Sequence, residues 1–238
     1  MDNQMYYDER SGLRFGSEPL HTYTAKTFGW MFLGLLVTFG VGIAFAVSGG
    51  MYAIFSMGTA GVFLLMLAEI VVVMVLSARL HSLSIGAARG LFFAYAALNG
   101  ITFSTIFFLY DVQILVTVFG LTALYFGVLS AYGFLTKRDL SGLRPILMAG
   151  LIFLAVYWVL AMFLPLSGAE RVMCFVGLAV FMGLTAYDTQ KIKHLHAAYE
   201  GDYEMSKKAS IIAALQLYLD FINIFLYILR LLGRRSND

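Results

Sequence analysis

Charged residues are scarce in this sequence, and their scarcity excludes an ordinary soluble domain. Only 13% of the 238 residues are charged, whereas soluble globular domains carry about 25%. Hydrophobic residues make up 61% of the chain, and the mean hydropathy is +0.83. This composition indicates an integral protein of the lipid bilayer that crosses it several times.

Other features are missing as well, and each absence excludes a class of protein. The single cysteine, Cys174, cannot form an intrachain disulfide, and the apolar run around it predicts a buried, structural thiol. A net charge of +2, without a basic run that contains aromatic residues, argues against nucleic-acid binding. The sequence contains no Walker motif, dinucleotide fingerprint or zinc-protease motif. Because a polar segment precedes the first apolar run, we expect no cleaved signal peptide.

The sequence does contain apolar runs that are long enough to cross a bilayer as helices. A helix rises ~1.5 Å per residue and the hydrocarbon layer is ~30 Å thick, so about 20 residues suffice. The predicted transmembrane helices are 27–47, 58–78, 90–109, 112–136, 145–164, 172–188 and 211–232, with a polar loop at 191–208 before the last one. We therefore predict one all-α domain of seven helices at 27–233, between a polar tail at 1–26 and a short basic tail at 234–238.

The distribution of lysine and arginine predicts the orientation of these helices. If the N-terminal tail is cytoplasmic, all but four of the 16 basic residues lie on the cytoplasmic side, as the positive-inside rule expects. The exceptions are Arg171, Arg230, Arg234 and Arg235. The last helix therefore either crosses and exports a basic tail, or enters the membrane and returns. Its length favours crossing, which is our prediction.

Polar residues in the last apolar run follow one face of a helix. Gln216, Asp220, Asn223, Tyr227 and Arg230 are spaced at i, i+4, i+7, i+11 and i+14. A carboxylate that faces lipid costs at least a few kcal/mol, so this face must look toward protein or water. We therefore expect the other six helices to be arranged around the C-terminal helix.

Two aspartates in or beside apolar runs are the main candidates for function. Asp188 ends the sixth run and is either an interfacial carboxylate near Lys191 or a functional group. Asp220 lies well inside its predicted helix, where bulk water solvates it less easily. It is either structural or part of a functional site. As a structural residue it would pair with Arg79 or Arg230, or accept a hydrogen bond from Tyr218 or Asn223.

The remaining ionisable residues give weaker signals. Glu69, in the middle of the second run, is either part of an ion path or a hydrogen-bonded contact between helices. His194 and His196 precede several acidic residues, but side chains two positions apart on a helix face different sides. We interpret this region as a solvated segment and not as a metal site.

The two aspartates lie in the segments 186–193 (Ala-Tyr-Asp-Thr-Gln-Lys-Ile-Lys) and 217–226 (Leu-Tyr-Leu-Asp-Phe-Ile-Asn-Ile-Phe-Leu). Both segments resemble motifs of the Bax inhibitor-1 family of transmembrane proteins. The segments 137–141 (Lys-Arg-Asp-Leu-Ser) and 99–102 (Asn-Gly-Ile-Thr) fit the same pattern. The resemblance extends over all the predicted helices and is to the bacterial branch of the family.

The resemblance implies six helices around the last one and a pH-sensitive calcium leak, here across a bacterial inner membrane. The family's aspartate pair, which holds the pore closed and senses pH, falls on Asp188 and Asp220. The family also uses an arginine of the second helix as a latch. That position falls on Leu80, so Arg79 can act as the latch only if the helix shifts slightly.

The chemistry of two neighbouring carboxylates agrees with this implication. At low dielectric they cannot both ionise cheaply, so they share a proton, titrate as a pair and can act as a switch. When both are ionised, they offer oxygen ligands to calcium, but two carboxylates are too few for its shell. Gln216, Asn223, backbone carbonyls or water would complete it, and Glu69 is a further position on the ion path. We expect calcium as the transported or bound ion, and no cofactor.

The sequence and the family resemblance are compatible with three functions. A leak channel gated by Asp188 and Asp220 is the first, with the bilayer, calcium and protons as partners. A regulator that binds membrane proteases or cell-death and stress factors is the alternative. An intramembrane aspartyl protease is the third. Its second aspartate would follow a Gly-x-Gly turn, whereas Asp220 follows Leu-Tyr-Leu, so we predict that the protein is not an enzyme.

Overall fold

The fold is a bundle of long helices, as the composition predicts. The computed structural model describes residues 5–7, 14–16, 18–161 and 163–233. Its helices are α1 (Leu20–Val47), α2 (Gly50–Ser56), α3 (Thr59–Ala78), α4 (Ile85–Phe103), α5 (Ile106–Leu109), α6 (Val112–Leu135), α7 (Arg144–Ala161), α8 (Glu170–Ala198) and α9 (Tyr203–Leu232). Short 3-10 turns, η1 (Ser141–Leu143) and η2 (Ser167–Ala169), precede α7 and α8. Seven helical segments in the described chain are long and apolar enough to cross a membrane, which confirms the predicted all-α membrane fold.

The N-terminal tail has more structure than the sequence indicates. Strands β1 (Met5–Tyr7) and β2 (Arg14–Gly16) pair antiparallel, and α1 begins at Leu20 instead of residue 27. The first turns of α1 are helical because they pack against the ends of α8 and α9. Tyr23 is buried and meets the ring of His196 edge to face, with 5.2 Å between the ring centroids. Thr27 and Ser210 share a hydrogen bond of 2.8 Å.

The predicted polar loop at 191–208 is wrong for most of its length. Helix α8 continues to Ala198, and α9 begins at Tyr203, where the Asp202 side chain accepts a hydrogen bond from the Met205 N–H (2.9 Å). The charged residues here extend two helices beyond their apolar segments. Lys208 illustrates the reason, because it is buried between Glu204 and the His81 carbonyl oxygen at 2.8 and 3.3 Å.

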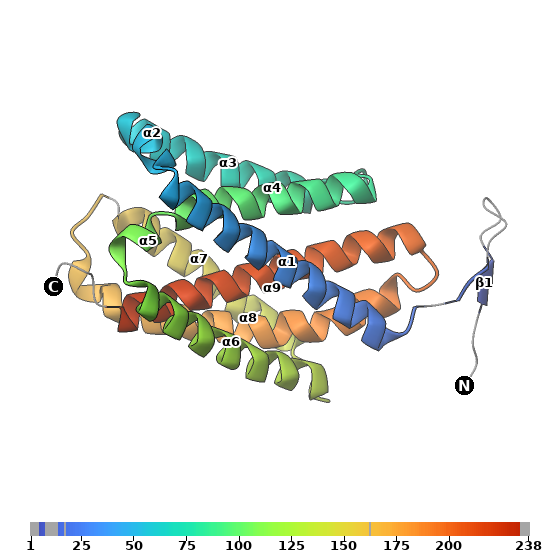
Figure 1. Cartoon of the computed structure of the whole chain (residues 1–238). Coiled ribbons are helices and arrows are strands. Elements are labelled where there is room, and N and C mark those ends of the chain that lie inside the picture. The colour runs from blue at the N-terminus through green and yellow to red at the C-terminus, as the bar shows by residue number, and fades with distance from the viewer. Residues whose placement is uncertain (1–4, 8–13, 17, 162, 234–238) are drawn as a thin grey trace.

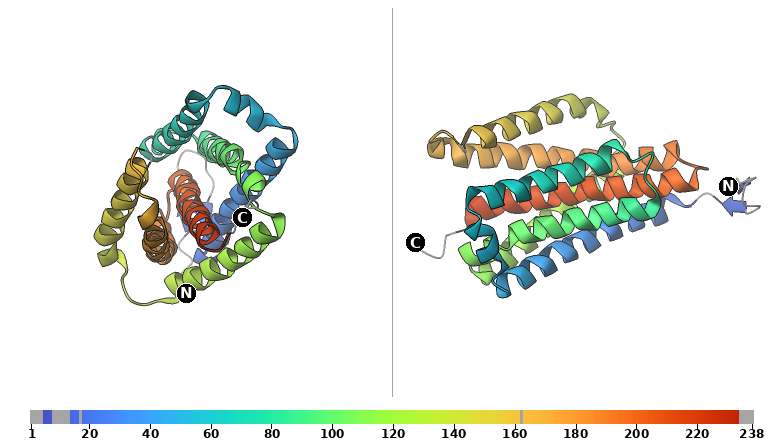
Figure 2. Two further views of the ribbon diagram at one scale, coloured as in Figure 1. Left: turned by 90° about the vertical axis from the view of Figure 1, so that its left-hand side faces the viewer. Right: turned by 90° about the horizontal axis from the view of Figure 1, so that it is seen from above.

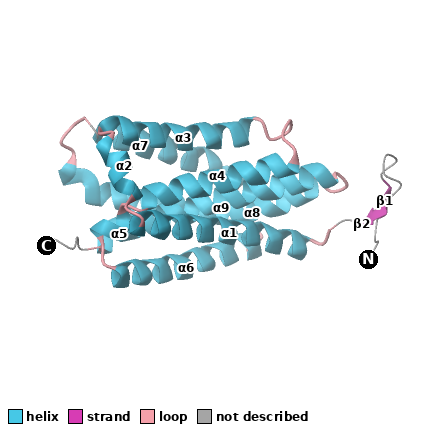
Figure 3. Cartoon of the chain, turned by 45° about the horizontal axis from the view of Figure 1, so that its top comes forward, coloured by secondary structure: helices cyan, strands magenta, loops and turns pink. Residues whose placement is uncertain are grey.

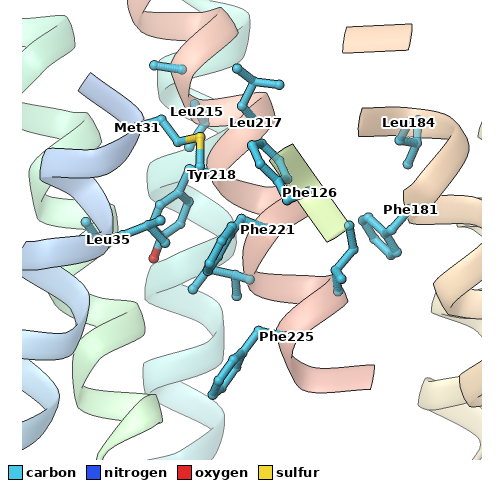
Figure 4. Close-up of a cluster of buried hydrophobic side chains, with 14 of the residues drawn as sticks. Met31, Leu35, Phe126, Phe181, Leu184, Leu215, Leu217, Tyr218, Phe221 and Phe225 are labelled. Carbon is cyan, nitrogen blue, oxygen red and sulfur yellow. The ribbon is translucent and has the colours of Figure 1, made fainter. Parts of the chain in front are cut away.

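Helix α9 is the most buried of the long helices, and the centre of the hydrophobic core lies along it (Figures 1 and 4). It packs directly against α1, α4, α6 and α8. Helix α3 packs mainly on α4, and α7 packs mainly on α8 (Figure 2). The arrangement of all six other helices around α9 therefore stays a prediction, since two of them lie mostly against other neighbours.

Aromatic side chains fill the contacts of α9 with its neighbours. Phe225 stacks on Phe103 of α4 at 5.8 Å between ring centroids and meets Phe39 of α1 at 5.9 Å. Phe221 meets Phe119 and Phe126 of α6 at 5.4 and 5.5 Å. Edge-to-face and offset aromatic pairs of this kind contribute about 0.5–1.5 kcal/mol each beyond the area they bury. They hold α9 against α1, α4 and α6.

A close helix approach positions α8 against α6. A Cβ atom added at Gly133 would collide with the carbonyl group of Ala186, so only glycine allows the two backbones to approach this closely. Ala186 lies half a turn before Asp188 on α8. The position of Asp188 in the bundle therefore depends on a glycine of another helix.

The helices run along one another, and the loops that join them gather at the two ends of the bundle (Figure 3). Helix α1 begins at one end, and α9 ends at the other (Figure 1). Helix α9 is unbroken over 30 residues. The unbroken length of α9 is enough for the predicted crossing of the membrane.

Candidate functional site

The two candidate aspartates lie on the most closely associated pair of helices, α8 and α9. Asp188 is 8% exposed and Asp220 is 3% exposed. The two carboxyl groups are close enough to interact electrostatically. The structure therefore brings together the residues that the motifs at 186–193 and 217–226 single out.

One carboxyl oxygen of Asp220 lacks a hydrogen-bond partner within the part of the chain that the structure describes. Its Oδ2 atom is buried and forms no hydrogen bond there, and the same is true of the hydroxyl oxygens of Thr189 on α8 and Ser130 on α6. A buried oxygen without a partner costs about 1–3 kcal/mol, and more when it is charged. Such a carboxyl group is stable only if it holds a proton, shares one with its neighbour or binds a cation.

The cation that faces the pair is Lys191. Its Nζ donates a hydrogen bond to Oε1 of Gln216 on α9 (3.2 Å), and its charge acts on both Asp188 and Asp220. Lys191 follows Asp188 by three positions on α8, so both side chains lie on one face of the helix. Lys191 falls in the polar loop predicted at 191–208, but it lies on α8, where its i, i+3 spacing from Asp188 indicates this role.

A second cation, Arg144, comes from the start of α7 and acts on Asp188. Arg79, which the sequence suggests as a latch, is exposed at the C-terminal end of α3. Among the described residues it forms no ion pair, and α3 packs on α4 instead of α8. The structure thus does not bring Arg79 to the aspartates, because α8 packs mainly against α6, α7 and α9, with a smaller contact to α1.

The other predicted residues on α9 lie around the pair without joining it. Gln216 and Asn223 lie on a half-buried face of α9, whereas Asp220 and Tyr227 are buried. Asn223 donates its Nδ2 hydrogen to the Leu219 carbonyl oxygen at 2.8 Å, which leaves its amide oxygen available. The predicted polar face of α9 is therefore divided between a buried part and a partly accessible part.

Glu69 is half-buried and lies on a different side of the bundle. Its Oε1 atom accepts a hydrogen bond from the hydroxyl of Thr102 on α4 at 2.5 Å. It is near enough to interact electrostatically with Tyr95 and Tyr218. Glu69 thus forms a hydrogen-bonded contact between α3 and α4. Its interaction with Tyr218 is a contact with α9, the helix that also carries Asp220.

A polar contact that the sequence analysis missed joins α9 to α1 and α4. The hydroxyl groups of Tyr218 and Thr38 share a hydrogen bond of 2.6 Å, and Thr38 also bonds to the Ala96 carbonyl oxygen at 2.9 Å. Tyr218 lies two positions before Asp220 and therefore points to another side of α9. The Tyr218–Thr38 hydrogen bond therefore holds α9 to α1 on the side of α9 that points away from α8.

The loop that follows α6 is attached to α8 next to the aspartate. Gln190 accepts a hydrogen bond from the Leu140 N–H (2.8 Å) and donates one to the Arg138 carbonyl oxygen (2.7 Å). In this loop, hydrogen bonds from the backbone and side chain of Ser141 lower the pKa of Asp139. The segments 137–141 and 186–193, which carry the family resemblance, are therefore in contact.

The candidate site around Asp188 and Asp220 offers oxygen atoms as possible metal ligands. No three His, Cys, Asp or Glu side chains gather into a metal-binding group in the described ranges. Instead of joining such a group, His196 bonds through Nε2 to the Glu18 carbonyl oxygen at 2.6 Å.

Comparison with known proteins decides the family. The model for the family described as "Inhibitor of apoptosis-promoting Bax1" matches residues 20–237. The chain belongs to the Bax inhibitor-1 family. Over 217 residues it is 40% identical to the inner membrane protein YbhL of Escherichia coli K12, a match that covers 91% of this chain and 93% of YbhL.

Other bacterial relatives of this Bax inhibitor-1 protein match it over nearly the same length. A Deinococcus radiodurans protein is 39% identical over 221 residues, covering 92% of this chain and 93% of the relative. A Borreliella burgdorferi protein is 36% identical over 216 residues, covering 91% and 93%. The seven apolar helices and the inner-membrane relative identify a multi-pass protein of a bacterial inner membrane. The family resemblance noted from the motifs is confirmed.

Proposed function

We propose that this protein is a pH-sensitive calcium-leak channel in which Asp188 and Asp220 form the pH sensor and the gate. The observation that carries the proposal is the burial of two interacting carboxyl groups on adjacent membrane helices. Intramembrane carboxyl groups are costly to keep and typically mark ion or proton paths. The unpartnered Oδ2 atom of Asp220 supports a role beyond packing.

The closed state has one proton shared by the two carboxyl groups. The pair then carries one negative charge, which faces Lys191, and α8 is held to α9 by the shared hydrogen bond and by this charge. Loss of the proton leaves two like charges side by side. Gain of a second proton removes the charge that attracts Lys191 and Arg144. Either change weakens the contact between α8 and α9.

These changes are large enough to operate a gate. A charge-assisted hydrogen bond nets about 1.5–3 kcal/mol. This free energy shifts an equilibrium between closed and open states by about one to two decades. No other force is needed for the pair to control a leak.

Calcium is the ion whose coordination fits the residues. It takes six to eight oxygen ligands in flexible geometry. When the pair is fully ionised it supplies carboxylate oxygens, and Gln216 and Asn223 add amide oxygens from the accessible face of α9. In the closed state Oε1 of Gln216 is occupied by Lys191, so opening must release this hydrogen bond. Glu69 supplies a further carboxylate on the α3 side of the ion path.

Calcium flux into liposomes tests the proposal. Wild-type protein should pass calcium to an extent that depends on pH, and Asp220→Asn, which keeps the shape but cannot titrate, should lose most of that dependence. Asp220→Ala should also change the leak of the closed state, because Asp188 is left without its partner. Asp111→Asn is the matched control, since Asp111 is an exposed carboxylate before α6 whose side chain forms no capping hydrogen bond.

Two outcomes would contradict the proposal. If Asp220→Asn keeps the wild-type pH profile, the pair is not the sensor. If wild-type protein passes no calcium at any pH, the alternative is favoured, in which the protein regulates membrane proteases or stress factors by binding them.

A further inference from the structure

An apolar groove opens on the outside of the bundle between α6, α8 and the end of α9. Its volume is about 720 Å³. The walls are formed by Leu121, Leu124 and Val128 of α6, Phe175 of α8 and Ile228 of α9, and Arg171 lies at its edge. A volume of this size lies in the range of ~300–1,000 Å³ that is typical of sites for small ligands.

The groove faces the acyl chains of the bilayer. Leu124, Val128 and Phe175 are 67%, 61% and 59% exposed. Along α6 the lining residues from Leu121 to Val128 cover about 10 Å at ~1.5 Å per residue. An extended acyl chain that lies along α6 and α8 would cover these side chains.

Arg171 supplies the polar end of the site. It lies in the first turn of α8 and is exposed, with no ion pair to any of the residues described. The one other described cation at this end of the bundle, Arg230, lies over the Trp158 ring at 4.0 Å. The positive-inside rule leaves this end poor in cations, so a free arginine at the mouth of an apolar groove is unusual. A guanidinium group binds phosphate with two parallel hydrogen bonds.

We propose that the groove between α6, α8 and α9 binds one anionic phospholipid, with the phosphate on Arg171 and an acyl chain against α6. The guanidinium group of Arg171 can bind the phosphate of a headgroup, while the apolar walls of the groove contact an acyl chain. The occupant is a lipid because the apolar walls open to the bilayer and the single charge matches one phosphate. The site lies apart from the aspartate pair and does not depend on any leak activity.

Native mass spectrometry of the detergent-purified protein tests this site. Titration with dioleoyl phosphatidylglycerol should show one lipid that remains bound at detergent concentrations that remove the others. Arg171→Gln should weaken binding about tenfold, which corresponds to the loss of a charge-assisted hydrogen bond. Leu124→Trp, which fills the groove from an exposed position, should weaken it independently.

Matched controls separate this site from general lipid contact. Arg79→Gln removes an exposed arginine of α3, and Ile146→Trp adds a tryptophan at a position of α7 that is 70% exposed. Both should bind the lipid as the wild type does, and dioleoyl phosphatidylcholine should bind more weakly than phosphatidylglycerol. Equal loss in Arg171→Gln and Arg79→Gln, equal binding of both lipids, or unchanged binding in both groove variants would overturn the proposal. Gel filtration confirms that each variant is folded.

Discussion

Lys191 and Gln216 join the two helices that carry the aspartates, with 3.2 Å between Nζ and Oε1. Because Lys191 also acts on both carboxyl groups, this contact ties the charge of the pair to the packing of α8 on α9. A change in the protonation of the aspartate pair should therefore alter the Lys191–Gln216 hydrogen bond between α8 and α9.

Replacement of Lys191 should change the pH response of the proposed leak. Lys191→Met keeps the apolar stem but removes the positive charge that stabilises the ionised form of the pair. Both protonation steps of the pair should then occur at higher pH, and the pH range over which the leak is closed should move upward by about one unit. Flux measured in liposomes over a series of pH values gives the two limits of this range. Lys137→Met, in the loop after α6, is the control, and an equal shift there would indicate a general surface-charge effect.

The C-terminus should lie on the opposite side of the membrane from the N-terminus. Helix α9 is unbroken, and it ends at the end of the bundle opposite the start of α1. A reporter fused after the last residue should therefore report the opposite side from one fused at the start. Both reporters on the same side would show that α9 returns, and the half-buried face of Gln216 and Asn223 would then line a vestibule.

The aspartates should not cut peptide bonds. Asp188→Asn and Asp220→Asn should leave no uncleaved membrane protein behind when they replace the wild type in cells, because Asp220 lacks the Gly-x-Gly turn that precedes the second aspartate of an intramembrane protease. Quantitative proteomics of the membrane fraction is the measurement. An intact single-span protein that accumulates in both variants and disappears with the wild type would establish an enzyme.

The approach of α6 to α8 should be sensitive to a single methyl group. Gly133→Ala places a Cβ atom against the Ala186 carbonyl group, so the backbones must separate, at a cost of about 1–3 kcal/mol. The thermal unfolding midpoint in detergent should fall, and the leak should change because Asp188 moves with α8.

Another glycine of the same helix gives the matched control. A Cβ atom at Gly127 would meet no atom within 4 Å. Gly127→Ala should leave the midpoint unchanged or raise it, since alanine favours a helix over glycine by about 1 kcal/mol. If both variants melt alike, the close contact at Gly133 is not needed for stability.

The number, order and apolar cores of the helices are predictable from the sequence because a bilayer imposes a minimum length on each run. The ends of the helices are not. The first turns of α1 and the segment 191–208 are polar, so a hydropathy criterion excludes them. They are helical because Tyr23, Thr27 and Lys208 find buried partners on other helices. Those contacts exist only after the bundle has assembled.

Asp188 and Asp220 could be chosen from the sequence, since a carboxyl group in or beside an apolar run is costly and the motifs around both match a family. The sequence does not show which cation lies next to the two aspartates. Arg79 and Lys191 are both plausible from the chain order, and the choice depends on which helices pack against α8. The glycine contact between α6 and α8, the loop bound by Gln190 and the broad contact between α8 and α9 place Lys191 at the pair and leave Arg79 exposed on α3. The sequence by itself determined the costly residues, and tertiary packing decided their partners, because contacts between helices depend on how each helix is rotated and how deep it lies.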